Sequence, residues 1–362
     1  MSAPFPSTTA STSPVSAPRV SILVVNYNGE AFLEACLDSL RRIDYPNFEV
    51  VVVDNASTDR SWQVLERFDG VRRVRSDRNR GFAGGNNFGL RHCTGDLILL
   101  LNSDTVVTPG FLSPLAGWLI DHPESMVVQG KMIVPGLGGV LDACGSHLTP
   151  LGFPCHRGYL KPDGPRYSGA WPVFCGKGAC LLLRREAIER AGGFLFDEDY
   201  FCYYEESDFC HRVWMGGGEV YFVGAEPIQH LMGGTSVQMK SSAFALSHYL
   251  RNQTFTLCAN LEAATLLRVL PPYFLMLFLS LLAQMLRRDV GAVMAHLGAL
   301  VVPYTERHRI RARRLSVAAF RKRSDAELWP IICRWPGWDY FWKTFQGRLA
   351  EYTDPDFPRS VG

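Results

Sequence analysis

The sequence predicts an α/β protein whose central sheet is mostly parallel and is covered by helices on both faces. Short apolar runs alternate with segments that carry apolar residues at helical spacing from residue 20 to residue 101. Strands that are apolar on both faces and are separated by helices are typical of a parallel sheet buried between two helical layers. With 362 residues, of which 47% are apolar, the chain can bury a large core.

The predicted elements begin with a continuous apolar run at Val20–Asn26, followed by a helix whose apolar residues extend from Phe32 to Leu40. The same alternation predicts strands at 48–53, 71–75 and 96–101 and helices at 57–68 and 82–92. Folds of this kind bind ligands beyond the carboxyl ends of their strands. The polar residues at those ends are therefore the first candidates for a site.

Residues 130–180 are rich in Gly and Pro and show no clear period, which predicts a functional loop or lid. A strand at 178–184 and a short helix should follow. The acidic, aromatic segment 197–208 then leads into a helix that ends near Trp214. After it we expect a strand at 220–223 and a loop that carries His230.

Charge and cysteine usage restrict the class of protein. The 37 Lys and Arg residues nearly balance the 35 Asp and Glu residues, for a net charge of +2, so we expect no nucleic-acid partner. The ten cysteines are scattered without a Cys-x-x-Cys pair, which favours free thiols in a reducing compartment. Residues 1–19 lack the apolar core of a secretory signal and are predicted to be a disordered leader. Together these features predict a cytoplasmic protein.

Residues 241–362 are predicted to form a helical region. Val269–Leu286 has no charged residue, but Pro271 and Pro272 at its start leave a helix of about 21 Å, which is short against a hydrocarbon core of ~30 Å. A second short apolar stretch, Val290–Val302, precedes a segment rich in arginine. We expect this region to lie in a membrane interface. A buried helical hairpin with a solvated basic face is the alternative.

Seven motifs occur in order along the chain: NYN (26–28), DNASTD (54–59), NRGFAGGNN (79–87), LLLNSD (99–104), GGFLFDEDYF (192–201), YYEESDFCHR (203–212) and HLMGGTS (230–236). This series resembles the family 2 inverting glycosyltransferases of GT-A fold, and its bacterial rhamnosyltransferase-like members in particular. The resemblance covers residues 20–240 and implies a GT-A catalytic domain there.

The resemblance implies that the ligand is a nucleotide-sugar donor. Tyr27 offers a stacking face for the base, and Asp54 can accept from the base imide N–H or from the ribose. The glycine-rich motif lets backbone approach the ligand. The implied donor-binding residues are Tyr27, Asn28, Asp54, Asn55, Arg80, Asn87, Asn102 and Asp104.

The same resemblance implies a divalent metal, Mn²⁺ or Mg²⁺, held by Asp104 and His230. Such a cation stabilises the charge that develops on the leaving diphosphate. Family members commonly carry Asp-x-Asp, whereas this chain has Asn102-Ser103-Asp104, so one carboxylate is missing and a mechanism with little metal dependence stays open. Glu206 matches the family's catalytic base, and Glu205 and Asp208 are further candidates in the same acidic cluster.

These residues together predict a glycosyltransferase that moves a sugar, with rhamnose suggested, onto a hydroxyl of a glycan or lipid-linked acceptor in cell-surface polysaccharide synthesis. We expect it at the inner face of the cell membrane. Another donor sugar with a polyprenyl phosphate acceptor is an alternative, as is a non-catalytic nucleotide-sugar sensor, although a sensor needs no base. A nucleotidyltransferase is disfavoured because NYNGE, after the first strand, carries no Lys or Arg for a triphosphate.

Overall fold

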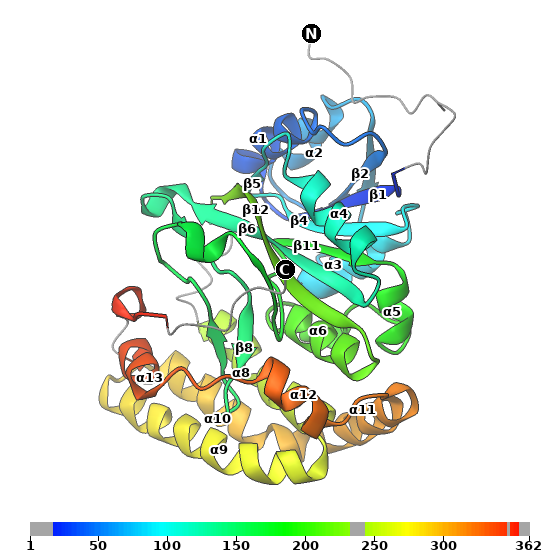
Figure 1. The fold of residues 1–362 in the computed structure, drawn as a ribbon. Coiled ribbons are helices and arrows are strands. Elements are labelled where there is room, and N and C mark those ends of the chain that lie inside the picture. Colours follow the sequence, from blue (N-terminus) through cyan, green and yellow to red (C-terminus); the bar gives the residue numbers. More distant parts are fainter. Residues whose placement is uncertain (1–16, 232–242, 346–347, 355–362) are drawn as a thin grey trace.

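The computed structural model describes residues 17–231, 243–345 and 348–354. A ten-stranded sheet forms the centre of the molecule, and a helical region packs below one end of it (Figure 1). The strands are β1 (Val20–Asn26), β2 (Phe48–Asp54), β3 (Val71–Arg75), β4 (Leu97–Asn102), β5 (Thr105–Val106), β6 (Ser125–Val134), β7 (Val140–Leu141), β8 (Ser146–Leu148), β9 (Pro154–His156), β10 (Ala170–Pro172), β11 (Cys180–Arg184) and β12 (Glu219–His230).

The helices of the catalytic region are α1 (Glu30–Leu40), α2 (Ser61–Glu66), α3 (Gly81–Leu90), α4 (Leu112–Asp121), α5 (Glu186–Arg190) and α6 (Glu205–Met215). The carboxyl-terminal helices are α8 (Ala243–Asn260), α9 (Ala263–Leu286), α10 (Val290–Thr305), α11 (Arg307–Phe320), α12 (Asp325–Ile332) and α13 (Trp338–Phe345). Short 3-10 turns are η1 (Pro135–Leu137), η2 (Pro165–Tyr167), η3 (Glu198–Tyr200) and η4 (Leu349–Glu351). The predicted leader falls mostly within residues 1–16, and the predicted boundary at residue 240 falls within 232–242. Both lie outside the described residues.

The sheet has the order β10-β12-β6-β11-β4-β1-β2-β3. Strands β3, β2, β1 and β4 pair in parallel, as predicted. In the other half, β11 pairs antiparallel with both β4 and β6, so the complete sheet is mixed. Strand direction was not readable at β11, because its fully buried Leu181–Leu183 run has the same pattern in either direction.

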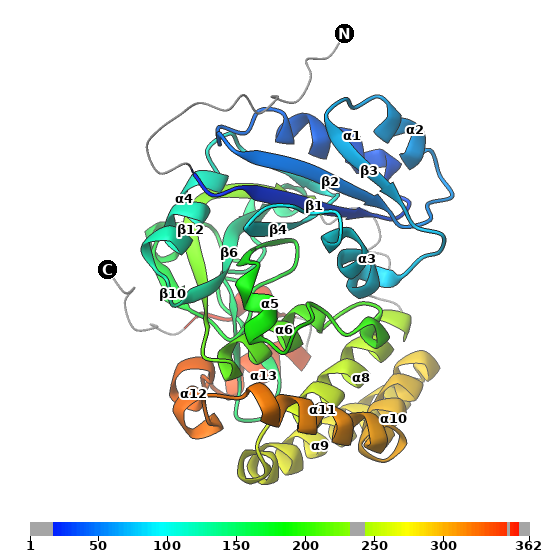
Figure 2. The same cartoon turned by 90° about the vertical axis from the view of Figure 1, so that its right-hand side faces the viewer.

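Helices cover both faces of the sheet, which confirms the predicted layers (Figure 2). On one face, α1, α2 and α4 bury apolar side chains such as Leu37, Leu65 and Leu115. On the other face, α3, α5 and α6 share a core with the carboxyl-terminal helices, in which Trp214 is fully buried. The helical region is thus part of the main core of the molecule.

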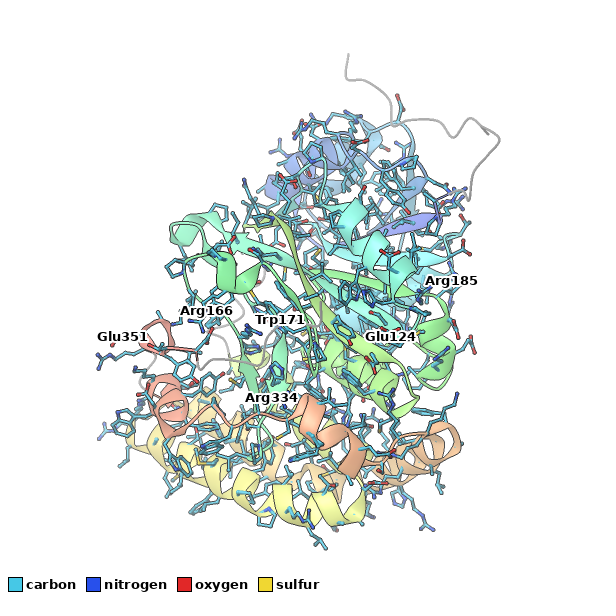
Figure 3. The ribbon with its side chains drawn as sticks, viewed as in Figure 1. Glu124, Arg166, Trp171, Arg185, Arg334 and Glu351 are labelled. Carbon is cyan, nitrogen blue, oxygen red and sulfur yellow. The ribbon has the colours of Figure 1, made fainter. Side chains whose placement is uncertain are left out.

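The glycine- and proline-rich segment 130–180 is more ordered than a lid. It contains β7 to β10, and β8 and β9 form a small antiparallel ladder. The carboxyl-terminal segment packs on it: Arg166, labelled in Figure 3, donates from Nη2 to the Asp354 carbonyl at 3.2 Å. The Asp354 carboxylate in turn accepts from the Gly158 amide at 2.7 Å and from the Tyr167 hydroxyl at 2.9 Å.

The expectation of a short apolar helix after the prolines is wrong, because α9 is continuous over 24 residues with Pro271 and Pro272 inside it. The prolines remove N–H partners from the carbonyls of Leu267 and Arg268, and both of these residues are exposed, so water can replace the lost bonds. The helix is about 36 Å long. By length and composition it could cross a membrane, and only 22% of its most apolar window is buried in the protein.

Candidate active site

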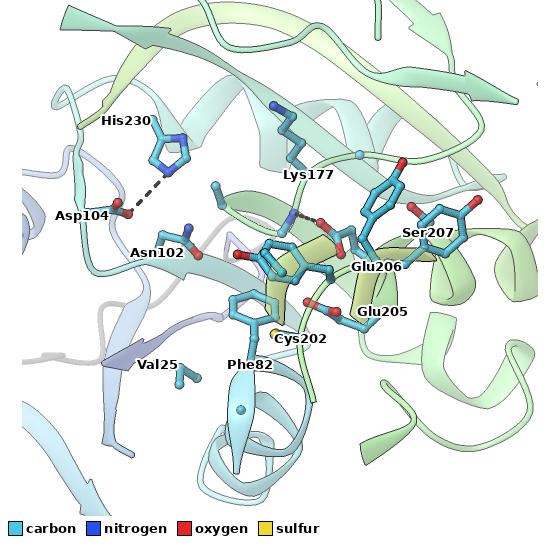
Figure 4. Close-up of a pocket in the computed structure, with 18 of the residues that line it drawn as sticks. Val25, Phe82, Asn102, Asp104, Lys177, Cys202, Glu205, Glu206, Ser207 and His230 are labelled. Atoms are coloured by element: carbon cyan, nitrogen blue, oxygen red, sulfur yellow. Dashed lines mark hydrogen bonds and ion pairs between the residues drawn. The ribbon is translucent and has the colours of Figure 1, made fainter. Parts of the chain in front are cut away.

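A pocket of about 580 Å³ lies at the carboxyl ends of the parallel strands, where the sequence predicted it. It collects residues that follow β1, β2 and β4 together with the start of α6 and the end of β12. Of the predicted site residues, it is lined by Tyr27, Asn55, Asn102, Asp104, Glu205, Glu206 and His230. In Figure 4, Asp104 and His230 lie on one side of the pocket, and Glu205 and Glu206 lie on the other.

The Asp104 side of the pocket depends on β12, which is longer than predicted and ends at His230 instead of leaving that residue in a loop. His230 pairs with Thr105 of β5, directly after Asp104. As a result, His230 Nε2 lies 3.4 Å from Asp104 Oδ1. Nε2 is buried and has no well-formed hydrogen bond to any described residue.

Asp142 completes this side of the site, although no sequence motif identifies it. Its Oδ2 lies 2.9 Å from His230 Nδ1, and its Oδ1 accepts from Lys177 Nζ at 2.6 Å. Asp142 comes from the irregular segment after β7, and Lys177 precedes β11. The only available signal was a charged residue within a mostly apolar stretch, and that signal is too weak to identify a site.

The electrostatics of this group follow from its burial and its charges. Burial alone would raise the pKa of Asp142, but Lys177 and His230 hold it well below its usual range. Burial alone would lower the pKa of His230, whereas the carboxylates of Asp104 and Asp142 raise it to about 9. The imidazole lies between two carboxylates, which favour its protonated form.

The geometry suits a divalent cation. A metal-binding histidine usually donates its other ring N–H to a carboxylate, and Asp142 occupies that position behind His230. Nε2 and the Asp104 carboxylate then face the same point of the pocket. No group of three His, Cys, Asp or Glu side chains in the described part of the chain could hold a metal by itself. The protein would therefore supply only part of the coordination shell.

Glu205 and Glu206 are the first two residues of α6 and face the opposite side of the pocket. Burial raises the pKa of both carboxyls, and the charge of Glu206 raises that of Glu205 further. Each has a buried Oε2 that no described residue hydrogen-bonds. Glu206 Oε1 accepts only a long bond, 3.4 Å, from the Gly178 amide. A raised carboxyl pKa with open acceptor positions suits a general base.

Asp208, predicted as a further catalytic candidate, lies elsewhere. It does not line the pocket, because its side chain points into the core, where Arg212 Nε lies 2.8 Å and Arg313 Nη1 3.2 Å from Oδ2. Asn260 donates to Oδ1 at 2.9 Å. Burial would raise the pKa of Asp208, but the two arginines lower it to about 2. Its placement fits a structural ion pair and not a base.

Two of the predicted donor-binding residues, Asp54 and Asn28, lie outside the large pocket. Asp54 is fully buried and lies outside the large pocket; its Oδ1 accepts from the Ser57 amide at 3.2 Å, and its Oδ2 lies 3.3 Å from Arg75 Nε. Ser57 and Arg75 line a second recess. Asn28 is exposed and accepts from the Thr58 amide at 2.8 Å.

The side chains of three other predicted donor-binding residues, Arg80, Asn87 and Asn55, bind other groups of the protein itself. Arg80 binds Asp77 at 2.6 Å, at the second recess. Asn87 donates to the Phe196 carbonyl at 2.8 Å and accepts from its amide at 3.1 Å, so it fixes α3 to the segment before η3 and is not placed to contact a donor. Asn55 lines the pocket, but its amide is bonded to Asn79 and to the backbone of residues 80 and 81.

A mixed sheet with helices on both faces and a polar pocket at the carboxyl ends of its parallel strands is the architecture of the nucleotide-diphospho-sugar transferase (GT-A) folds. Residues 21–192 match the model of glycosyl transferase family 2. This match covers just under half of the chain and confirms the resemblance for that part of the sequence.

Individual proteins agree with this assignment. The chain is 32% identical over 190 residues to the O-antigen biosynthesis protein RfbC of Myxococcus xanthus, covering 49% of this chain and 14% of RfbC. It is 27% identical over 199 residues to the low-salt glycan biosynthesis hexosyltransferase Agl10 of Haloferax volcanii, covering 54% of this chain and 61% of Agl10. The chain thus spans less than two thirds of either relative.

Among solved structures, the fold is similar to the mannosyltransferase PcManGT from Pyrobaculum calidifontis, determined in complex with GDP-Man and Mn²⁺. The TM-score is 0.52 with 20% sequence identity, over 87% of this chain and 90% of PcManGT. At this identity the similarity concerns the fold alone.

Proposed function

We propose that the chain is an inverting glycosyltransferase that transfers a sugar from a nucleoside diphosphate donor to a hydroxyl of a glycan or lipid-linked acceptor in cell-surface polysaccharide synthesis. One observation carries the proposal. A single pocket presents an aspartate–histidine pair on one side and, on the other, the buried Glu205 and the half-buried Glu206, each with a buried Oε2. The first pair suits a metal-bound diphosphate, and the second suits a base for an incoming hydroxyl.

On the donor side, Asp104 and His230 would hold Mn²⁺ or Mg²⁺, with the donor diphosphate and water filling the remaining positions. When bound, the cation supplies charge stabilisation to the departing diphosphate. Asp142 keeps the His230 proton on Nδ1 and leaves Nε2 free to ligate. Tyr27, at the end of β1, offers a face on which the base can stack. That PcManGT was solved with Mn²⁺ and a nucleotide sugar supports this arrangement.

On the acceptor side, Glu206 takes the proton of the acceptor hydroxyl as its oxygen attacks the anomeric carbon. The bond between that carbon and the diphosphate oxygen breaks in the same step, so the configuration inverts. Glu206 is ready for this role because its Oε2 is unbonded to described residues and burial keeps its pKa raised. Glu205 lies beside it in the pocket, and the charge of Glu206 raises the pKa of the Glu205 carboxyl beyond the effect of burial.

The acidic pair also favours a hydroxyl over a polyprenyl phosphate as the acceptor. A phosphate is already ionised and needs no base, and two neighbouring carboxylates would repel it. The sequence resemblance suggests rhamnose as the donor sugar, carried on dTDP. The names of RfbC and Agl10 support a role in glycan synthesis.

The donor can be identified by thermal-shift measurements with dTDP-rhamnose, UDP-sugars and GDP-sugars, each with and without Mn²⁺. A donor that binds the native state raises its melting temperature. We expect one nucleotide class to stabilise the protein, and to do so more strongly with Mn²⁺. If no nucleotide sugar shifts the transition with either Mn²⁺ or Mg²⁺, the proposed function is refuted.

We further propose that the protein is cytoplasmic and binds the inner face of the cell membrane through α9 and α10. These helices expose a set of large apolar side chains: Leu275, Phe278, Leu279, Leu282, Met285, Leu286, Val290, Met294, Leu297 and Val301. Arg268, Arg287 and Arg288 lie beside them and are exposed, which suits an anionic lipid surface.

The way α9 packs favours a helix lying along the membrane over one crossing it. Val269, Tyr273, Leu277 and Leu281 recur every four residues and are all buried, and Tyr273 shares a 2.8 Å hydrogen bond with Thr254 of α8. One full face of α9 is therefore attached along its length to the protein. Only the opposite face is available to lipid.

Co-sedimentation with phosphatidylglycerol-containing vesicles tests this proposal. The double substitution Leu275→Ser with Leu279→Ser removes two side chains that are 57% and 50% exposed, so binding should fall by at least about tenfold. Ile120→Ser with Leu137→Ser, at 54% and 55% exposure on the catalytic region, is the matched control and should bind like the wild type. Equal binding by all three proteins would contradict the proposed surface.

A further inference from the structure

The segment that leads into α6 has an unusual backbone. Phe201, Tyr203 and Tyr204 have φ values of 60°, 69° and 73°, a region that bulky side chains rarely occupy. Tyr204 is followed directly by the glutamate pair. Such conformations persist only where neighbouring groups hold them in place. The groups that hold this segment therefore also determine where the two carboxylates point.

One side chain from the carboxyl-terminal region provides most of this hold. Asn252 of α8 donates from Nδ2 toward three carbonyls of the segment: Tyr200 at 3.0 Å, Cys202 at 3.1 Å and Tyr203 at 2.8 Å. The remaining carbonyl, that of Phe201, accepts from the Ala83 amide of α3 at 3.1 Å. Four consecutive carbonyls are thus fixed by two helices that are distant in sequence.

The close approach of α3 requires glycine at its first position. Gly81 has a φ of 67°, and a Cβ there would lie 2.1 Å from the Phe201 carbonyl oxygen. The glycine-rich motif thus serves this segment, in addition to any part it has in approaching a ligand.

Asn252 is fully buried, and its orientation is fixed. Its Oδ1 accepts from Arg251 Nη1 at 3.0 Å. Because a guanidinium can only donate, Oδ1 must face Arg251, and the NH₂ group must face the three carbonyls. One turn further along α8, Thr256 shares a 2.6 Å hydrogen bond with the Tyr200 hydroxyl, which fixes the start of the same segment.

We infer that Asn252 is a positioning residue for transfer: through the carbonyls of residues 200, 202 and 203 it sets the direction of Glu205 and Glu206. This inference rests on the proposed function, because it assigns the orientation of the proposed base to a residue outside the GT-A core. It makes α8 a component of the active site. It also gives a role to the buried amide of Asn252, whose two N–H hydrogens are shared among three carbonyls of one strained segment.

The inference is tested with Asn252→Ala and Asn252→Ser, and with Thr254→Val as a matched control. Thr254 is equally buried on the same helix and hydrogen-bonds Tyr273 of α9 and the Leu250 carbonyl, not the segment before α6. A small misplacement of a catalytic group can cost about 100-fold in rate. We expect the alanine variant to lose about 100-fold in kcat while its KM for the donor changes by less than about threefold. The serine variant, which can still donate one bond, should lose less, and Thr254→Val should keep wild-type kcat.

Hydrogen–deuterium exchange of peptides that cover residues 198–212 gives a second measurement that needs no activity. Asn252→Ala should accelerate exchange there, and Thr254→Val should not. If kcat stays at the wild-type value, if donor KM rises as much as kcat falls, or if exchange changes equally in both variants, the inference is refuted. A wild-type protein that transfers no sugar would instead refute the proposed function, and the exchange comparison would still test Asn252.

Discussion

Replacing Asp142 by Asn should weaken divalent metal binding. In the wild type, Asp142 accepts from both His230 Nδ1, at 2.9 Å, and Lys177 Nζ, at 2.6 Å. The asparagine has a single side-chain oxygen, and Lys177 can only donate, so that oxygen must face Lys177. The NH₂ group then faces His230 Nδ1 and drives the ring proton onto Nε2. Because Nε2 is the atom that would ligate the metal, the favoured tautomer cannot bind it.

The magnitude follows from comparable groups behind metal-binding histidines, whose loss costs ~10–100-fold in metal affinity, or about 1.4–2.8 kcal/mol. The assay is calorimetric titration of Mn²⁺ into protein saturated with whichever of UDP, GDP or dTDP stabilises it most. The double variant Asp142→Asn with Lys177→Met should recover part of the affinity, because the amide oxygen is then free to accept from His230. Wild-type affinity in Asp142→Asn, or no recovery in the double variant, would show that Asp142 does not set the tautomer of His230.

Three further predictions follow from the acidic residues of α6. Glu206→Gln should keep donor affinity but lower kcat by ~10²–10⁴-fold, and wild-type turnover would exclude it as the base. Burial raises the pKa of Glu206, and the base acts only when it is ionised. The value of kcat/KM should therefore fall as the pH is lowered through a value above the usual glutamate pKa of ~4.3. A fall that occurs only at or below pH ~4.3 would show that the base is solvated. Arg313→Ala should destabilise the fold by about 3 kcal/mol in denaturant unfolding, since it breaks a buried pair with Asp208. The exposed Arg311→Ala on the same helix should cost less than about 0.5 kcal/mol, and equal costs would contradict a structural role for Arg313.

Much of the catalytic fold was predictable because its signals are local. The apolar runs of β1, β2 and β4 and the polar residues at their ends are adjacent in sequence, and the rule that ligands bind at carboxyl ends places Asp104 in the pocket. Glu206 could be selected because the acidic pair at the start of α6 is visible in the sequence and its second member matches the catalytic base of the family that the sequence resembles. The direction of β11 and the continuity of α9 depend on neighbours instead, and no local pattern specifies them.

The residues that were missed act through long-range contacts. Asp142 lies 38 positions after Asp104 and 88 before His230, in a segment without periodicity. Asn252 is 49 residues from the nearest carbonyl it holds. Asp208 was misassigned for the converse reason: it lies within the acidic cluster in sequence, but its side chain lies outside the pocket, against Arg212 of the same helix and Arg313 of α11.

Those arginines also revise the view of the basic segment after α10 as a purely membrane-facing surface. Arg313 pairs with Asp197 at 2.5 Å and with Asp208, and Arg314 donates to the Cys258 and Leu261 carbonyls at 2.8 Å each. Removing α9 to α11 would leave Asp208 with one cation fewer in the core and would expose the apolar face of α8. The free energy of unfolding would then fall by several kcal/mol. A truncation therefore cannot separate membrane binding from folding. Only substitutions confined to exposed side chains of α9 and α10 can measure the membrane contribution, because the inner faces of the same helices and the basic residues of α11 are part of the structure that positions the catalytic helix.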